Sequence, residues 1–249
     1  MTYEQILRYL KAHANSANVE GMARFGINPR GTLGLSMPFL RQTAKRIGVD
    51  HRLALRLWSS GIHEARILAA LIDDPARVTP AQMDRWIGDF DSWDVCDQVC
   101  GNLFDRTPFA RRKAAAWARK KPEYERRAGF ALMAALAWHD KQADDEVFLG
   151  YLTVIERYAF DERNFVKKAV NWALRNIGKR GRALHKAAVA CARRIAKQDS
   201  RTARWVAADA LRELTDPKVI ARMSDRAVSR NATTKNMRSK PRFLHIKLL

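Results

Sequence analysis

Three short segments of the chain carry residues that could do chemistry. They read SWDVCD at 92–97, RRAGFALM at 126–133 and KKAVNWALR at 167–175. Helical spacing places Trp93 and Asp97, four residues apart, on the same shoulder of a helix. A fixed carboxylate beside an indole can stabilise a cation, such as the oxocarbenium ion that develops when a glycosidic bond breaks. The alternative is an ordinary helix-surface aspartate that pairs with an arginine of the next helix.

The third segment places a tryptophan off its own core face. At about 100° per residue, one arc of the helix predicted over 162–178 is apolar and predicts a core face, and it holds Val166, Ala169, Val170, Ala173, Leu174 and Ile177. Trp172 lies roughly 140° from that arc, on the side that carries Lys168, Arg175 and Lys179. We interpret Trp172 as a platform for a base or sugar, with phosphates held by the cations. The alternative is that a neighbouring helix covers it.

Arg126 and Arg127 begin a helix whose segment 129–138, GFALMAALAW, is apolar on every side. Such a helix is buried on most sides, and a buried guanidinium needs an anion because an unpaired buried charge is very costly. That anion is Asp94 or Asp97 in one interpretation, and a DNA phosphate held bidentately in the other.

The elements that position these residues are predicted to be helices throughout, joined by short connections. The predicted ranges are 2–14, 36–47, 50–59, 62–73, 79–88, 92–105, 108–120, 123–138, 144–158, 162–178, 182–197 and 201–214. Segments 166–177 and 203–214 resemble each other at a separation of 37 residues, and 125–136 fits the same frame 41 residues earlier. A period near 40 built from helix pairs predicts an all-α, HEAT-like or armadillo-like superhelix with a concave basic groove. We expect one domain over 1–223.

Charge is distributed unevenly along the 249 residues, whose net charge is +20. Residues 1–110 carry 13 basic and 12 acidic residues, whereas 111–249 carry 33 and 14. A one-sided positive field of this size favours a polyanion, either nucleic acid or an acidic membrane surface. Segment 224–249 has seven basic residues and one acidic residue, and we expect a flexible basic tail there.

Several other classes of site find no support in the sequence. No run of 18 apolar residues predicts a membrane span, and no histidine spacing predicts a metal site. Nucleotide-binding and serine-hydrolase motifs are absent, so no cofactor is expected. Cys96, Cys100 and Cys191 cannot all pair, which favours a reducing cytoplasm and small buried thiols.

Together and in this order, the three segments resemble the AlkD-like DNA alkylation-repair glycosylases, which are HEAT-repeat proteins. The resemblance implies that Asp97 is the catalytic carboxylate, that Trp93 and Trp172 pack against the deoxyribose, and that Arg127 contacts the backbone near the lesion. It also implies release of cationic alkylated purines, such as 3-methyladenine and 7-methylguanine, without flipping the base into a pocket. Residues 21–34 are shorter than the corresponding segment of the family, and Phe25 stands where tyrosine is common.

The prediction is therefore a monomeric, cytoplasmic DNA glycosylase that acts on double-stranded DNA and uses no metal, cofactor or membrane. The expected DNA contacts are cations on or near the second and third segments and one cation of the following repeat. They are Arg126, Lys167, Lys168, Arg175, Lys179 and Arg204. Two alternatives remain open. One is a non-catalytic binder of DNA structures such as branches, because some relatives excise nothing. The other is a scaffold for an acidic protein partner.

Overall fold

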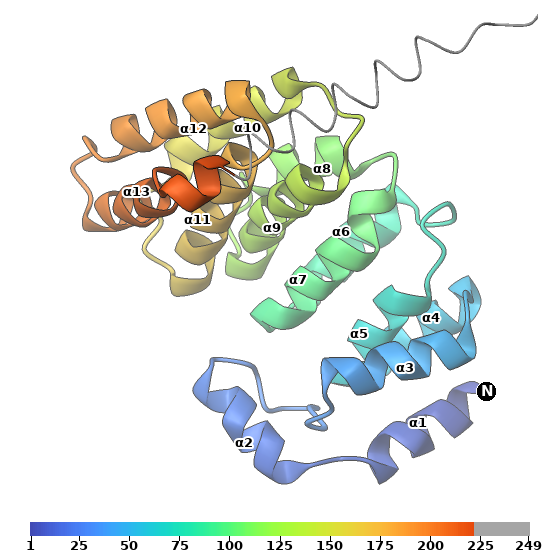
Figure 1. Cartoon of the computed structure of the whole chain (residues 1–249). Coiled ribbons are helices and arrows are strands. Elements are labelled where there is room, and N and C mark those ends of the chain that lie inside the picture. The colour runs from blue at the N-terminus through green and yellow to red at the C-terminus, as the bar shows by residue number, and fades with distance from the viewer. Residues whose placement is uncertain (222–249) are drawn as a thin grey trace, which may run out of the picture.

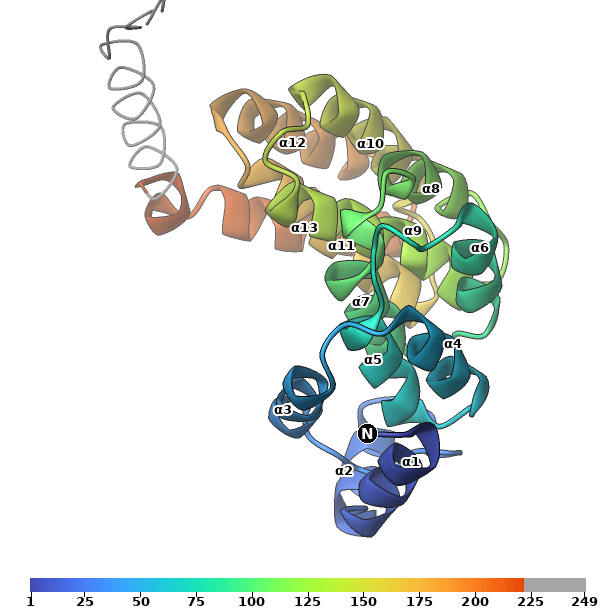
Figure 2. The ribbon, with the colours of Figure 1, turned by 90° about the vertical axis from the view of Figure 1, so that its right-hand side faces the viewer.

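The computed structural model describes residues 1–221, and within that range the ordered elements are helical, without a strand. The chain begins with α1 (Tyr3–Ala12) and α2 (Ser16–Arg24). The remaining helices stack as pairs into a curved superhelix, which Figure 1 and Figure 2 show from two sides. None of the described helices is long and apolar enough to cross a bilayer.

The superhelix has two rows of helices (Figure 2). The inner row follows the concave side and consists of α3 (Met37–Ile47), α5 (His63–Ile72), α7 (Trp93–Asn102), α9 (Glu123–His139), α11 (Asn164–Gly178) and α13 (Arg201–Leu214). The outer row consists of α4 (His51–Ser59), α6 (Pro80–Gly88), α8 (Ala110–Trp117), α10 (Asp145–Tyr158) and α12 (Arg182–Ile195), and the 3₁₀ turn η1 (Phe104–Arg106) follows α7. All three chemical segments of the sequence therefore lie on inner helices.

Helix α9 forms the centre of the core. Its residues 127–137 are all buried, as expected for a helix that is apolar all round. Gly129 permits this burial, because a Cβ atom there would lie 2.2 Å from the backbone nitrogen of Ala118 at the end of α8. The two backbones can approach so closely only because position 129 has no side chain.

Aromatic rings join the outer helices. Trp58 of α4 stacks on Trp86 of α6 with ring centroids 3.9 Å apart and an interplanar angle of 2°. Phe104 continues the contact to Trp117 of α8. Large flat rings bury much apolar area per side chain, so this row ties three successive repeats together.

The all-helical prediction and the core face of 162–178 are confirmed: all six of its predicted core residues are fully buried. The prediction differs from the structure at two places. It contains no helix over 16–24, where the structure has α2 with Asn15 as its N-cap. The predicted helix 92–105 ends at Asn102, and a separate 3₁₀ turn follows. The domain limit at 223 stays a prediction, and the tail 224–249 lies outside the described residues.

Candidate functional site

Arg127 connects three successive inner helices. From α9, its Nε and Nη2 donate to the two carboxylate oxygens of Asp97 on α7, at 3.0 and 2.7 Å. Its Nη1 donates to the carbonyl oxygen of Phe165 on α11, at 2.5 Å. Arg127 is only 5% exposed, whereas 17% of the Asp97 side chain remains accessible. The guanidinium thus fixes a carboxylate that still reaches the surface.

Each charge of the Asp97–Arg127 pair opposes the effect that burial has on the pKa of the other group. Burial raises the pKa of Asp97 above its ordinary value, and the guanidinium of Arg127 acts in the opposite direction. Burial lowers the pKa of Arg127, but the charge and hydrogen bonds of Asp97, together with the nearby thiols of Cys96 and Cys100, outweigh burial and leave the pKa raised. A bidentate pair of this geometry is among the stronger interactions that a carboxylate makes.

Trp93 lies beside this pair at the start of α7. The guanidinium carbon of Arg127 is 5.9 Å from the centroid of the indole. The indole nitrogen donates to the carbonyl oxygen of Phe25, at 3.0 Å, in the loop that follows α2. In the same loop Gly26 adopts a φ of 77°, and a Cβ atom there would lie 2.6 Å from the ring of Phe165. The loop therefore touches both α7 and α11 beside the Asp97–Arg127 pair.

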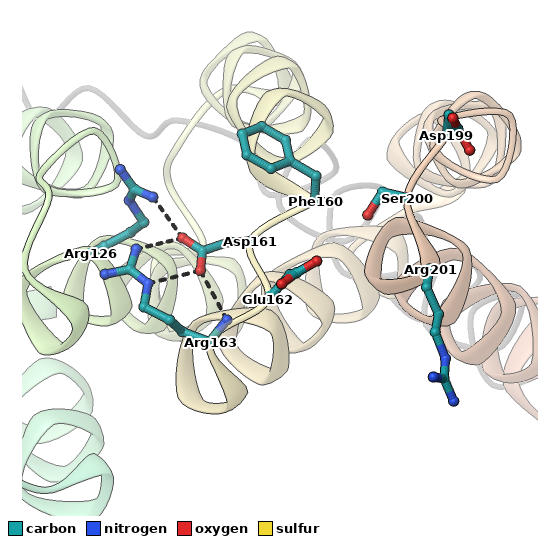
Figure 3. A pocket seen from close by; sticks show the side chains of 8 residues that line it. All are labelled: Arg126, Phe160, Asp161, Glu162, Arg163, Asp199, Ser200 and Arg201. Carbon is teal, nitrogen blue, oxygen red and sulfur yellow. Dashed lines mark hydrogen bonds and ion pairs between the residues drawn. The ribbon is translucent and has the colours of Figure 1, made fainter.

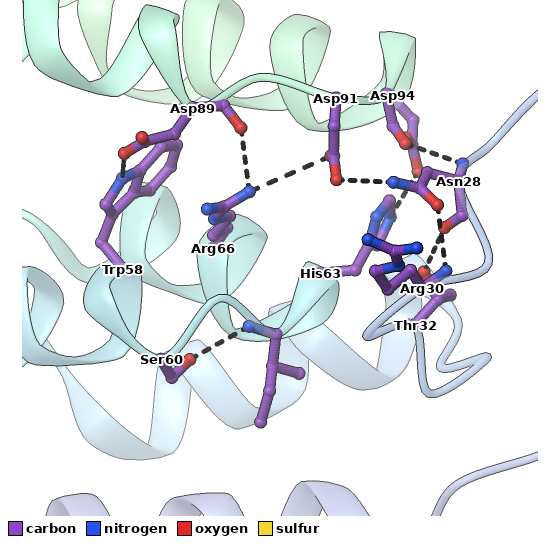
Figure 4. Close-up of polar contacts among 12 residues, drawn as sticks. Asn28, Arg30, Thr32, Trp58, Ser60, His63, Arg66, Asp89, Asp91 and Asp94 are labelled. Carbon is purple, nitrogen blue, oxygen red and sulfur yellow. Dashed lines mark hydrogen bonds and ion pairs between the residues drawn. The ribbon is translucent and has the colours of Figure 1, made fainter.

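A histidine–aspartate pair also involves the first turn of α7 (Figure 4). His63 of α5 contacts a carboxylate oxygen of Asp94 through Nε2 at 2.8 Å, and both side chains are largely buried. The backbone nitrogen of Asn28 donates to the hydroxyl of Ser92, at 2.9 Å, and its side chain to Asp91, at 2.8 Å. These bonds hold the loop after α2 against the beginning of α7.

The buried carboxylate of Glu64 fixes the far end of that loop. It accepts hydrogen bonds from the backbone nitrogens of Leu33, Gly34 and Leu35, at 2.7 to 3.1 Å. Backbone donors of this kind stabilise an ionised carboxylate without a cation. Residues 28–35 are consequently held at both ends by acidic side chains of the inner row.

Of the four predicted catalytic residues, three come together, because Arg127 contacts both Asp97 and Trp93. Asp97 pairs with an arginine of the next inner helix, which is one of the two interpretations the sequence left open. Trp172 lies on α11, partly buried and packed against core side chains. Among the described residues, no hydrogen bond, ion pair or ring contact joins it to the other three. Part of its surface is thus covered by the protein itself.

The expectation that Arg127 grips a phosphate requires correction, because three of its donors are used internally and little of its surface is exposed. Arg126 likewise pairs with Asp161 at 2.6 Å and lies over the ring of Tyr158. Figure 3 shows Arg126 and Arg163 converging on Asp161, while Arg201 points away from them. The sequence did not predict the Arg126–Asp161 pair, because its two residues lie 35 positions apart on different helix pairs.

Four further predicted phosphate contacts also have internal partners. Arg175 and Lys179 both bind the carboxylate of Glu213 on α13. Lys167 lies over the indole of Trp205, with 5.4 Å from Nζ to the ring centroid. Arg204 is half exposed and lies 3.6 Å from Asp199. Lys168 is exposed. Of the predicted DNA contacts in the described part of the chain, its side chain makes the fewest contacts with other side chains.

Sequence reasoning missed the His63–Asp94 pair and the role of the loop at 25–35. His63 is one of six histidines of the sequence, and Asp94 was considered only as a partner for Arg127. The sequence spacing could have indicated the pair. His63 and Asp94 are 31 residues apart, and Asp97 and Arg127 are 30 residues apart. Both spacings place partners at corresponding positions of successive inner helices.

Cys96, Cys100 and Cys191 are free and buried, as predicted for small apolar side chains. Burial raises the pKa of the Cys100 thiol well above its ordinary value. Residues 1–221 contain no group of three or more metal-ligating side chains.

Known proteins share the sequence pattern and the fold of this chain. Residues 6–214 match the sequence model of a family described as DNA alkylation repair enzyme. The chain belongs to this family. The resemblance carried by the three segments is confirmed at that level, and in this family member Arg127 contacts both Asp97 and Trp93.

A solved structure supports the fold of this family member. It represents a family of proteins related to the HEAT-like repeat DNA glycosylases with affinity for branched DNA structures. The two chains share 20% sequence identity with a TM-score of 0.71, over 83% of this chain and 92% of the other. That likeness shows a HEAT-like helical repeat fold. No curated protein shows a significant sequence match.

Proposed function

We propose that the protein is a DNA glycosylase that hydrolyses the N-glycosidic bond of cationic alkylated purines, such as 3-methyladenine and 7-methylguanine, in duplex DNA. The observation that carries the proposal is the partly exposed Asp97 carboxylate, fixed by Arg127 beside the indole of Trp93. Membership of the alkylation-repair family supports the substrate class.

The chemistry requires little from the protein beyond a placed negative charge. When the C1′–N bond breaks, the base leaves with the electron pair and its positive charge is neutralised, while C1′ becomes part of an oxocarbenium ion. Water then attacks C1′ and gives up one proton. A carboxylate that faces C1′ stabilises the charge that develops there. The cationic base is already a good leaving group, so no strong general acid is needed.

Asp97 can serve this role while it is paired. A carboxylate has about four lone-pair positions, and a bidentate arginine uses two of them. The accessible part of the side chain leaves the others for a sugar. Arg127 opposes the rise that burial causes in the pKa of Asp97 and holds the carboxylate in one orientation, which is the preorganisation that electrostatic catalysis depends on.

Trp93 would pack against the deoxyribose, and Lys168 and Arg204 would contact phosphates. Trp172, which lies two turns beyond Phe165 on α11, would extend the surface along the DNA. We further propose that the protein acts as a monomer in the cytoplasm, where its free cysteines would remain reduced.

A second candidate is a binder of branched DNA without base release. The same ion pair favours it, because Arg127 offsets the charge of Asp97 and a neutralised carboxylate stabilises a sugar cation less well. The structural neighbour has affinity for branched DNA and is related to the glycosylases.

Purified protein incubated with methylated duplex DNA distinguishes the two candidates. The glycosylase proposal expects free 7-methylguanine or 3-methyladenine in the soluble fraction, measured by chromatography. Tight binding to a four-way junction with no released base would favour the second candidate.

A further inference from the structure

An exposed tryptophan lies on the last inner helix, away from the Asp97–Arg127 pair. Trp205 of α13 is 43% exposed. The buried face of α13 consists of Ala203, Val206, Ala207, Ala210 and Leu214. At about 100° per residue, Trp205 lies roughly 160° from the centre of that face. The free side of the inner row is the concave surface (Figure 2), so the indole belongs to that surface.

Cations from two helices lie around this indole. The Nζ atom of Lys167, on α11, is 5.4 Å from the ring centroid. Arg201 precedes Trp205 by one helical turn and is exposed, and Figure 3 shows it directed away from the ion pairs of Asp161. Lys168 is exposed on the concave side of α11, roughly 180° from the core face of that helix. The indole is therefore the apolar centre of a basic surface.

The carboxylates near this surface already have partners. Asp199 lies 3.6 Å from Arg204 at the start of α13. Asp209, one turn after the indole, pairs with Arg212. Both carboxylates thus meet arginines other than the cations beside the ring, which leaves the surface with an excess of positive charge.

An exposed aromatic ring among cations is the combination with which proteins bind unpaired nucleic-acid strands. The cations attract the phosphates, and the ring stacks on a base, because every base has a π-face. Within a duplex, neighbouring base pairs cover both faces of each base. A ring on the concave surface consequently gains stacking only where a strand is already unpaired.

We propose that Trp205 stacks on an unpaired base where a DNA duplex frays or branches, while Lys168 and Arg201 bind adjacent phosphates. Trp205 lies three inner helices beyond Asp97, which at roughly 8–10 Å between helix axes places it about 25 Å away, or about seven base pairs. The lesion therefore stays in its duplex, and no base is flipped. This stacking platform rests on the DNA binding of the proposed function but not on its catalysis.

The test compares two unmodified duplexes with splayed ends. In one, both strands continue as unpaired arms of four thymine nucleotides. In the other, the arms consist of four abasic nucleotides, so the two forks carry the same number of phosphates and differ only in the bases. We expect the wild type to bind the thymine fork at least about fivefold more tightly, measured by fluorescence anisotropy at one salt concentration, because stacking on an aromatic side chain contributes on that scale.

Trp205→Ala should bind the two forks with equal affinity, and Trp205→Phe, which keeps a ring, should retain part of the preference. The matched control is Trp138→Ala at the end of α9. Trp138 is 53% exposed, and Nζ of Lys141 lies 5.3 Å from its ring centroid, as Lys167 lies over Trp205. This control should keep the full thymine preference. Thermal unfolding verifies that each variant is folded before its affinity is measured.

Equal affinity of the wild type for the two forks overturns the platform proposal. A thymine preference that survives in Trp205→Ala, or that Trp138→Ala loses to the same extent, also overturns it. Neither fork contains an alkylated base, so the result does not depend on catalysis. A protein that prefers the thymine fork but releases no methylated purine would retain the platform and lose the glycosylase proposal.

Discussion

At the scale of single residues, Arg127 is the side chain on which the candidate site depends. It binds Asp97 with two hydrogen bonds and reaches the backbone of α11 with a third. Removal of one partner from a buried ion pair leaves the other charge buried and uncompensated. The stability of the protein is therefore coupled to the integrity of the site.

We predict that Arg127→Met lowers the free energy of unfolding by about 3–5 kcal/mol, measured by urea denaturation. The matched control is Arg56→Met, because Arg56 pairs with Glu4 on the surface. Loss of the exposed Arg56–Glu4 ion pair should lower the free energy of unfolding by less than about 1 kcal/mol. Arg56 also lies over the ring of Tyr3, and the loss of that contact adds to this value. Similar losses in the two variants would show that the Asp97–Arg127 pair is not a buried anchor.

His63 gives the protein a predicted dependence on pH. Burial lowers the pKa of His63, but its hydrogen bond to Asp94 and the charge of Asp94 outweigh burial and leave the pKa raised. A raised folded pKa stabilises the protein below the unfolded value of about 6.5, and the stabilisation is lost as the pH rises through the folded pKa.

The destabilisation caused by His63→Gln should consequently be larger at about pH 5.5 than at about pH 8.5. Thermal unfolding of both proteins at each pH measures this difference. A destabilisation that grew with pH would mean that His63 is held neutral by burial and that Asp94 does not favour its protonated form.

At the scale of elements, polar partners are usually one repeat apart. Arg127 and Asp97 are separated by 30 residues, His63 and Asp94 by 31, and Arg175 and Glu213 by 38. Periodicity within one helix predicted the core face of α11 correctly, because an angle around one helix decides it. It could not show which neighbour covers Trp172 or which carboxylate meets Arg126, since that depends on how helices stack.

Helix α2 was missed for a related reason. Its sequence SANVEGMAR contains a glycine and few apolar residues, so it has no strong apolar face to detect. It forms next to the loop that Glu64 and Ser92 hold in place. The residues that make these contacts lie far apart in sequence, so the contacts that fix the loop beside α2 cannot be read from the sequence of the helix.

The close approach of α8 and α9 supplies a prediction at this scale. Gly129→Ala should lower the free energy of unfolding by at least about 1–3 kcal/mol, because the new methyl group meets the backbone of Ala118. Gly150→Ala in α10 meets open space and should instead raise stability by up to about 1 kcal/mol. Denaturant unfolding of both variants checks the pair, and equal effects would contradict this account of packing at Gly129.

At the scale of the whole molecule, the net charge is +20, yet several cations of the inner row already have partners. Arg126, Arg175 and Lys179 are held by Asp161 and Glu213. Such internal pairs reduce the number of cations available to DNA below the number that the sequence indicates. Affinity should still depend steeply on salt, since a net charge of +20 remains.

We expect the logarithm of DNA affinity to fall with the logarithm of salt concentration at a slope steeper than about −3. Lys168→Ala should reduce the steepness by about one, whereas Arg175→Ala should change it less because Arg175 is paired with Glu213. Fluorescence anisotropy over a range of salt concentrations measures the slopes. A larger effect of Arg175→Ala than of Lys168→Ala would show that DNA displaces the internal pair.

The most direct test of the central claim is the single-turnover rate of 7-methylguanine release from a duplex with one lesion, at saturating protein. Asp97→Asn should slow release by at least about 100-fold, as expected for the loss of a preorganised electrostatic group, while affinity for DNA remains close to that of the wild type. Asp84→Asn, which alters an aspartate of the outer helix α6 paired with Lys113, should release the base at the wild-type rate. Equal rates for the wild type and a folded Asp97→Asn protein would contradict the assignment of Asp97 to the reaction.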